Sequence, residues 1–224
     1  MSEVLVVAPH MDDEVLGCGG VICRHKESGD TVSVVFVAHR VYDHRFDEER
    51  NRFEQACALK AKEVLGYDTA IFLDLPDERL DRALQEMIVP LERVVAELRP
   101  HTIYLPFRGD NNQDHRAVFD AARVAVRPAA TPFVNNIYMY EVPSSTDQSP
   151  PMVETAFMPN FYVETVACFE RKLKALTCYT TEMRSFPHPR SEEGLSVLAR
   201  KRGMEIGFDF AEAFVVLRQK WGAE

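Results

Sequence analysis

The chain lacks the features of a secreted, disulfide-stabilised or membrane-spanning protein. Its 224 residues include only five cysteines, an odd number, and no two of them form a CxxC pair. A disulfide framework or a zinc site built from thiolates is therefore not expected. The N-terminus has no basic segment followed by an isolated apolar stretch, and no apolar run is long enough to span a bilayer. These absences favour a cytoplasmic protein.

Positive charge is also scarce. The chain has 26 Lys and Arg residues against 35 Asp and Glu residues, which gives a net charge of -9. Nucleic-acid binding needs basic patches, and anionic membranes attract basic surfaces, so neither partner is expected. Apolar residues make up 46% of the chain, which is enough for a buried core, and the length fits one domain over residues 1–224.

Apolar strands alternate with helical patterns up to about residue 130. Continuous apolar runs predict buried strands at 4–8, 31–38, 70–75 and 102–106. Helical patterns follow at 14–29, 45–65, 80–98 and 115–126, with Pro90 expected to kink or divide the third helix. This alternation predicts βαβ units and a mostly parallel sheet in an α/β fold.

The last third of the chain has a different texture. Shorter and more polar strands are predicted at 136–142 and 160–166, separated by a loop that contains SSTDQSPP. Two further helices are predicted near 167–183 and 191–207. No repeat or low-complexity tail divides this part from the rest.

Ionisable residues follow each of the four predicted parallel strands. The segments are PHMDDE, HRVYDHR, PDERLD and FRGDNNQDHR, at 9–14, 39–45, 76–81 and 107–116. In an open parallel sheet, ligands bind beyond the carboxyl ends of the strands. Because all four segments lie at such ends, one polar site is expected at that edge of the sheet.

The first of these segments predicts a metal site. His10 and Asp13 are three residues apart at the entrance to a helix, so they can share a face. His115 begins the helix after the fourth strand and is the natural third ligand. Two histidines and one carboxylate leave a position for water, as in catalytic zinc sites, and adjacent Asp12 could act as general base. Capping of the helix by Asp12 or Asp13 is the simpler alternative.

Two motifs resemble a known family. APHMDDEVLGCGG resembles the AHPDDE signature of the LmbE/PIG-L family of zinc-dependent N-deacetylases, and GDNNQDHR at 109–116 resembles its second motif, which ends in DH. The glycine-rich helix, the PDERLD loop and the region from RKLKALTCYTTEM to FAEAF also match the layout of the family. The resemblance thus spans essentially the whole chain.

The resemblance implies a Rossmann-like, three-layer α/β fold with helices on both faces of the sheet. It also implies hydrolysis of an N-acetyl group from an amino sugar or an amino-sugar conjugate. His10, Asp13 and His115 would bind Zn²⁺, with other divalent ions also accepted, and Asp12 would be the base. Asp114 would be a carboxylate that orients a neighbouring side chain. Relatives commonly form homo-oligomers.

The chain departs from the family pattern at two positions. Met11 replaces the usual proline after the first histidine, which changes no ligand. Asn112 stands where many members have the first histidine of HxDH, a residue that assists the transition state. Asn112 offers only a neutral hydrogen bond to an oxyanion. A protonated group from another loop is the alternative, with His39, Arg108 and His188 as candidates.

Substrate-binding residues are predicted less specifically. The arginines lie near the helix after the second strand or in strand-end loops, and a solvated surface is their simpler interpretation. For Asp77, a role in a turn after Pro76 is the simpler interpretation. The loop SFPHPRS at 185–191 holds two further candidates between prolines. The full set of candidates is Arg45, Arg50, Asp77, Arg108, His188 and Arg190.

Other classes of protein compete with a deacetylase. A non-haem iron enzyme also uses two histidines and one carboxylate. A non-catalytic, metal-binding relative would keep the ligands without the reaction. A nucleotide-binding module would need GxGxxG or a P-loop directly after the first strand, whereas GCGG at 17–20 follows the acidic residues.

Overall fold

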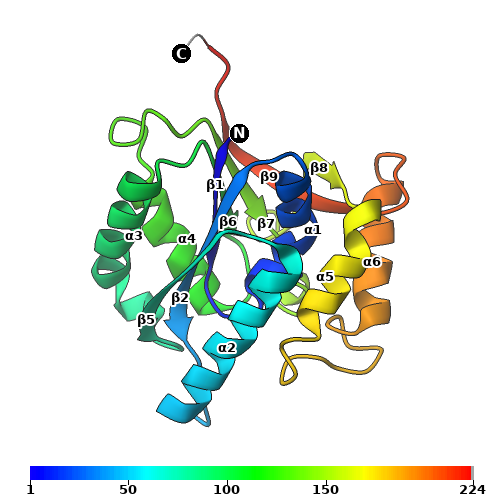
Figure 1. Ribbon diagram of the computed structural model, residues 1–224, viewed down its shortest axis with the longest axis horizontal. Coiled ribbons are helices and arrows are strands. Elements are labelled where there is room, and N and C mark those ends of the chain that lie inside the picture. Colours follow the sequence, from blue (N-terminus) through cyan, green and yellow to red (C-terminus); the bar gives the residue numbers. More distant parts are fainter. Residues whose placement is uncertain (223–224) are drawn as a thin grey trace.

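The computed structural model describes residues 1–222 and shows a seven-stranded sheet with helices on both faces (Figure 1). The strand order is β5-β2-β1-β6-β7-β9-β8. The five strands β5, β2, β1, β6 and β7, adjacent in this order, pair in parallel. Strand β9 is antiparallel to both of its neighbours, β7 and β8. The α/β fold with a mostly parallel sheet is therefore confirmed. The strands are β1 Glu3–Ala8, β2 Thr31–His39, β5 Thr69–Pro76, β6 Thr102–Pro106, β7 Asn136–Tyr140, β8 Phe161–Glu164 and β9 Ala211–Gln219.

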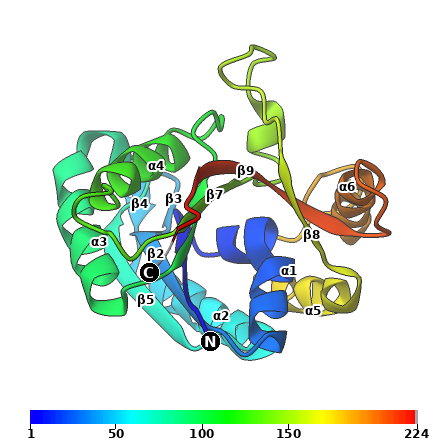
Figure 2. The same cartoon turned by 90° about the horizontal axis from the view of Figure 1, so that it is seen from above.

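The helices form two layers (Figure 2). One face is covered by α1 Asp13–Glu27, α2 Glu48–Leu65 and α5 Phe169–Leu176, and the other by α3 Leu84–Leu98 and α4 Gln113–Ala125. Helix α6, Glu192–Met204, packs beside β9. Within residues 1–222 there are also three short 3-10 turns: η1 Leu80–Arg82, η2 Thr146–Gln148 and η3 Val166–Cys168. None of the helices within residues 1–222 has both the length and the apolar character that crossing a membrane requires.

The central strands are apolar on both sides because each side faces a helix layer. In β1, Val4 and Val6 belong to the core beneath α1 and α2, whereas Leu5 and Val7 belong to the core beneath α3 and α4. Alternate side chains of a strand point to opposite faces, so a continuous apolar run is what a doubly covered strand needs. This requirement made the parallel strands visible in the sequence.

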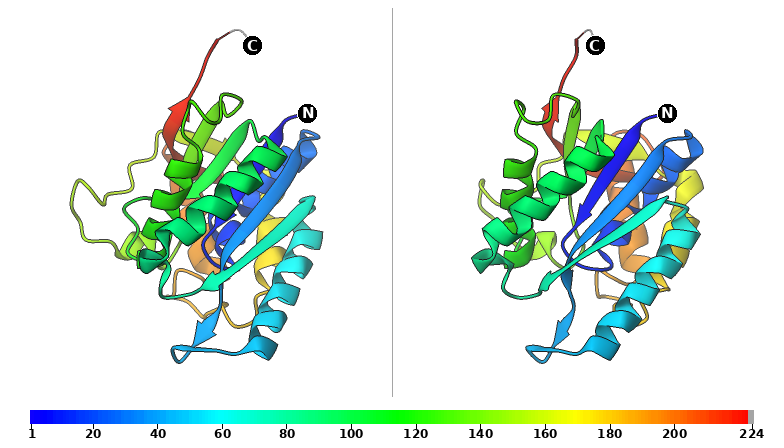
Figure 3. Two further views of the ribbon diagram at one scale, coloured as in Figure 1. Left: turned by 90° about the vertical axis from the view of Figure 1, so that its left-hand side faces the viewer. Right: turned by 60° about the vertical axis from the view of Figure 1, so that its left-hand side comes forward.

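The sheet changes direction between β1 and β6. From β1 the chain builds outward through β2 to β5, and it then returns to place β6 on the other side of β1. Loops that leave two adjacent strands in opposite directions open a crevice at their carboxyl ends. A small hairpin, β3 Val41–Tyr42 with β4 Arg45–Phe46, projects at the same end, opposite both termini (Figure 3).

Several predicted boundaries were wrong. Residues 45–46 form strand β4, and α2 begins only after Asp47, whose side chain caps it by accepting a hydrogen bond from Arg50 N. Helices α5 and α6 are shorter than the predicted 167–183 and 191–207. Pro90 lies inside a continuous α3, and the break falls before it, at Ala83 between η1 and α3.

Strand β9 was not predicted at all. Its buried segment contains Glu212, whose charge interrupts the apolar pattern. Glu212 accepts hydrogen bonds from Gly20 N and Val21 N of α1, both at 2.7 Å, and pairs with Lys172 Nζ at 2.6 Å. Lys172 also donates to the carbonyl of Leu16 at 2.8 Å. A buried glutamate is tolerated here because distant segments balance its charge and fill its hydrogen bonds.

The glycines of α1 allow the helix to approach the sheet closely. A Cβ on Gly17 would lie 2.2 Å from Cδ2 of Tyr140, a buried ring whose hydroxyl donates to the carbonyl of Val7 at 2.8 Å. A Cβ on Gly20 would lie 2.5 Å from Thr165 Cγ2. Close packing therefore requires glycine at these two positions. This packing determines how closely the start of α1 approaches the sheet.

Replacing Gly17 by alanine should destabilise the fold. Helix propensity would favour alanine by about 1 kcal/mol, but overpacking typically costs about 1–3 kcal/mol. The contact with Tyr140 is severe, so we expect a net loss of about 2 kcal/mol, measured by urea denaturation. Gly222→Ala is the control, because nothing lies within 4 Å of a Cβ there. Equal stabilities of the two variants would contradict the packing argument.

Candidate active site

Two histidines and an aspartate meet where the loops after β1 and β6 converge. The Oδ2 atom of Asp13 lies 3.4 Å from His10 Nδ1 and 3.2 Å from His115 Nε2. One ligand atom from each of the three residues lies within 4.8 Å of the others, and all three side chains are buried. The backbone N–H of His10 also donates to Asp13 Oδ2, at 2.9 Å. The chain thus brings together the three residues predicted as ligands, from positions more than 100 residues apart.

Each imidazole has further carboxylates behind it. His10 Nε2 lies 2.9 Å from Asp77 Oδ1 and 3.4 Å from Asp114 Oδ2, while His115 Nδ1 lies 3.4 Å from Asp110 Oδ2. In both histidines, the nitrogen opposite Asp13 therefore faces an acid. A carboxylate at that position fixes the ring and its tautomer in many metal sites, leaving the other nitrogen free to bind the ion.

The supporting carboxylates are themselves held in place. Asp114 accepts hydrogen bonds from the backbone N–H groups of Glu78, at 2.7 Å, and Leu80, at 3.2 Å. Asp110 accepts hydrogen bonds from the hydroxyls of Ser145 and Thr146. The loops after β5 and β6 and the turn at η2 are thereby tied to the histidines.

The electrostatics of this group favour a bound cation. Burial alone would lower the pKa of His10, but hydrogen bonds with Asp114, Asp13 and Asp77 outweigh it and hold the pKa well above its usual value. Burial likewise opposes the charge of His115, yet Asp13 and Asp110 raise its pKa to about 9. Buried carboxylates in excess thus demand positive charge, and two imidazoles with one carboxylate are donors suited to a divalent ion.

Asp12 lies beside this group and is 1% exposed. Burial raises its pKa to about 6, although the guanidinium groups of Arg190 and Arg40 act in the opposite direction. Its backbone N–H donates to Glu14 Oε2 at 3.2 Å, and Glu14 Oε1 accepts from the hydroxyl of Tyr179 at 2.6 Å. Burial raises the pKa of Glu14 to about 8. A carboxylate with a pKa near neutrality can accept and return a proton.

The remaining predicted residues differ in their distance from this centre. Asn112 caps α4, since its side-chain oxygen accepts a hydrogen bond from Asp114 N at 2.8 Å. Asp77 contacts His10, and Arg190 contacts Asp12, with Nη1 2.7 Å from Oδ2. The side chains that the structure leaves exposed on the surface are those of Arg45, Arg50 and Arg108.

His188 is only partly buried, and its Nδ1 accepts a hydrogen bond from Arg190 N at 3.1 Å. His39 is the last residue of β2, its Nδ1 is 3.0 Å from the carbonyl of Asp74, and its ring packs on Phe46. Neither contact joins these two histidines to His10, Asp13 or His115.

Three charged residues of this group of side chains were not singled out in the sequence. Asp110 lies in the second motif, two residues before the cap of α4, and that position could have marked it as a partner of His115. Arg40 directly follows β2, and Glu182 lies in the loop after α5. No local pattern distinguishes the latter two from surface charges, because their role depends on contacts with Asp12 and Arg190.

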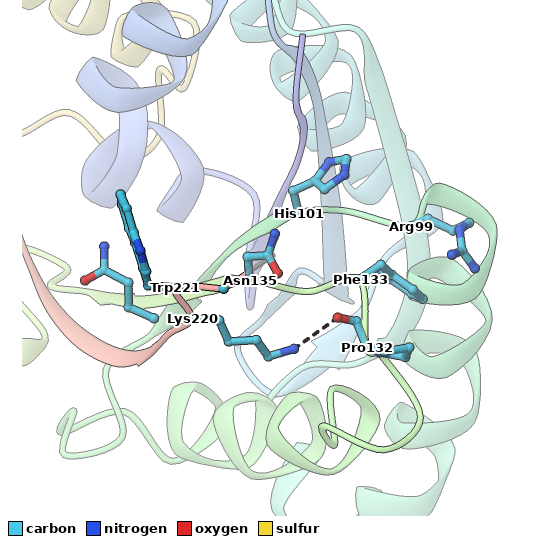
Figure 4. A pocket seen from close by; sticks show the side chains of 9 residues that line it. Arg99, His101, Pro132, Phe133, Asn135, Lys220 and Trp221 are labelled. Atoms are coloured by element: carbon cyan, nitrogen blue, oxygen red, sulfur yellow. Dashed lines mark hydrogen bonds between the residues drawn. The ribbon is translucent and has the colours of Figure 1, made fainter. Parts of the chain in front are cut away.

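A sizeable hollow lies away from these residues. It has a volume of about 910 Å³ and opens at the opposite edge of the sheet, before β6 and β7 (Figure 4). Its walls include His101, Phe133, Asn135 and Trp221, and Lys220 Nζ donates to the carbonyl of Pro132 at 3.1 Å. This hollow shares no residue with the buried histidines, so its size does not make it the active site.

The family of the chain follows from its sequence. Residues 5–126, more than half of the chain, match the family model PIG-L, described as GlcNAc-PI de-N-acetylase. The chain therefore belongs to the PIG-L family, as the resemblance of its two motifs to LmbE/PIG-L proteins implied. Membership of this family identifies it as an N-deacetylase, a hydrolase.

The chain is also similar to individual proteins in sequence or in fold. The uncharacterised deacetylase YaiS of Escherichia coli K12 is 28% identical over 179 residues, covering 75% of this chain and 89% of the relative. The N,N'-diacetylchitobiose deacetylase of Pyrococcus horikoshii has a TM-score of 0.77 at 21% identity, covering 97% of this chain and 84% of that one.

The same fold also serves another reaction. The 4-carboxy-2-hydroxymuconate hydratase GalB of Pseudomonas putida has a TM-score of 0.77 at 20% identity, covering 100% and 99% of the two chains. At such identities the two solved structures establish the fold alone, and they confirm its three-layer α/β architecture. The substrate must be argued from the site.

The capping role of Asn112 can be tested by mutation. Asn112→Ala removes the cap of α4 and should cost about 1 kcal/mol, whereas Asn112→Asp should keep most of the stability. Asp120→Asn, on the exposed side of α4, is the control. Thermal denaturation of the three variants gives the comparison. An alanine variant as stable as the parent would show that the observed cap contributes nothing.

Proposed function

We propose that the protein hydrolyses the N-acetyl group of an amino sugar or of an amino-sugar conjugate, using a bound divalent metal ion. The observation that carries this proposal is the meeting of His10, Asp13 and His115 beside Asp12. Membership of the PIG-L family supports hydrolysis of an amide and a substrate of the N-acetylglucosamine type. The P. horikoshii structure, a deacetylase of a diacetylated sugar, supports the same substrate class.

The three residues would hold the ion through His10 Nδ1, Asp13 Oδ2 and His115 Nε2, because these atoms face one another. Zinc is the ion we propose, and other divalent ions with similar ligand preferences could replace it. When bound, the ion would polarise the amide carbonyl and acidify water. Asp77, Asp114 and Asp110 would keep the imidazoles oriented and strengthen them as ligands.

Asp12 would be the general base. It would remove a proton from the attacking water and then pass that proton to the nitrogen of the departing amine. Its burial supports this role, because a desolvated carboxylate binds a proton more readily than an exposed one. The carboxylates around the site would also accommodate the ammonium group of the product. The side-chain oxygen of Asn112 caps α4 by accepting a hydrogen bond from Asp114 N.

A screen of acetate release tests the proposed reaction. Protein loaded with zinc is incubated with N-acetylglucosamine, its glycosides, its nucleotide-linked form and its thiol conjugates. We expect acetate and a free amine from at least one compound, loss of activity with a chelator, and recovery when zinc is restored. Asp12→Asn should retain metal and lose about 10²–10⁴-fold in kcat.

A control replaces Asp120 by asparagine, since Asp120 is exposed on α4 and pairs only weakly with Arg123, at 3.8 Å. This variant should hydrolyse the substrate at the parent rate. Metal-loaded protein that releases no acetate from any amino sugar would contradict the proposed function. Full activity of Asp12→Asn would contradict the assigned base.

A further inference from the structure

The backbone of Asp12 has a conformation that few side-chain-bearing residues adopt, with φ 131° and ψ -27°. Its carbonyl accepts hydrogen bonds from Val15 N, at 3.1 Å, and Leu16 N, at 2.9 Å, which start helix α1. Its N–H is held by Glu14. Such strained residues persist only where surrounding contacts fix them. These contacts fix the main chain of Asp12 and leave the direction of its carboxylate to other groups.

Two arginines contact that carboxylate, and both contacts fall on the same oxygen. Arg190 Nη1 lies 2.7 Å from Asp12 Oδ2, and Arg40 Nη2 lies 3.8 Å from it. Arg190 comes from the loop before α6, and Arg40 follows β2, so distant segments converge on one atom. The close Arg190 contact is a charge-assisted hydrogen bond, the stronger kind of hydrogen bond.

Arg190 is held on its other sides as well. Its Nη1 lies 2.6 Å from Glu182 Oε2, and its Nε donates to Ser144 Oγ at 2.7 Å. Glu182 also pairs with Arg40, through Oε1 at 2.8 Å. A guanidinium with three fixed partners has little freedom to rotate, so it can hold the Asp12 carboxylate in one orientation.

The charges of this group balance. Asp12 and Glu182 supply two negative charges, and Arg40 and Arg190 supply two positive charges. The side chains of the two arginines are only 16% and 17% exposed. Because each guanidinium already has carboxylate partners, the group is unsuited to binding a phosphate of the substrate. Its contacts point inward, to Asp12.

We propose that Arg190, anchored by Glu182, is a positioning residue that fixes the direction of the Asp12 carboxylate. This inference rests on the proposed role of Asp12 as general base. Arg190 engages Oδ2, and Oδ1 is then the oxygen that meets the water. The cation closest to the base is Arg190, whereas Arg108 is exposed and His39 contacts the carbonyl of Asp74.

Kinetics of Arg190 variants test the proposal. A misplacement of about 1 Å can cost about 10²-fold in rate, so Arg190→Ala should lower kcat about 10²-fold while KM changes little. Millimolar guanidine should restore part of kcat to this variant, because it can enter the vacated position. Arg190→Lys should retain more activity than Arg190→Ala. Glu182→Gln should lower kcat in the same direction by a smaller factor, and it serves if Arg190→Ala does not fold.

The matched control is Arg200→Ala. Arg200 is exposed on α6, the helix that follows the loop of Arg190, and its guanidinium lies over the ring of Phe210. The substitution removes the same charge and should leave kcat unchanged. Metal content and the melting temperature are measured for every variant. A fall in kcat that follows lost metal or lost stability, without guanidine rescue, would assign Arg190 a purely structural role.

A crystal structure of Arg190→Ala separates this proposal from the proposed reaction. We expect the Asp12 carboxylate to rotate away from its position in the parent protein. An unchanged Asp12 side chain would overturn the positioning role, whether or not the parent hydrolyses an N-acetyl sugar. Conversely, a rotated carboxylate in a protein without deacetylase activity would support the contact and contradict only the function proposed for it.

Discussion

The structure depends on one carboxylate oxygen, Oδ2 of Asp13, which faces an imidazole nitrogen of His10 on one side and of His115 on the other. Asp13 is buried, and burial would raise its pKa, yet the charges and hydrogen bonds of the two histidines hold the pKa well below its usual value. A buried anion must be neutralised by neighbours that are precisely placed. Strands β1 and β6 and helices α1 and α4 hold His10 and His115 in these positions.

The fold supplies this placement by close packing. The change of direction between β1 and β6 brings the first turn of α1 next to the first turn of α4. Glycine at position 17 lets α1 lie against Tyr140. The buried pair Lys172–Glu212 contacts the α1 backbone on both sides of this position, Lys172 at Leu16 and Glu212 at Gly20 and Val21. The C-terminal strand β9, which carries Glu212, thus contributes to the same helix that begins with Asp13. Residues throughout the chain support one short segment.

Much of this was predictable from local sequence. The strands at 4–8, 31–38, 70–75 and 102–106 were visible because each is covered on both faces, and His10, Asp13 and His115 could be grouped because strand ends in a parallel sheet share an edge. The network around Asp12 was not predictable, since Arg40, Glu182 and Arg190 meet only through tertiary contacts. Strand β9 was missed for a related reason, because the partner that neutralises Glu212 lies 40 residues away in the sequence.

Anomalous X-ray diffraction at the zinc absorption edge, from crystals grown with Zn²⁺, tests the central claim most directly. The account predicts one strong anomalous peak within bonding distance of His10, Asp13 and His115, with Asp12 beside the ion but not bound to it. A peak bound by other residues, or crystals in which the two imidazoles face away from each other and hold no zinc, would contradict it.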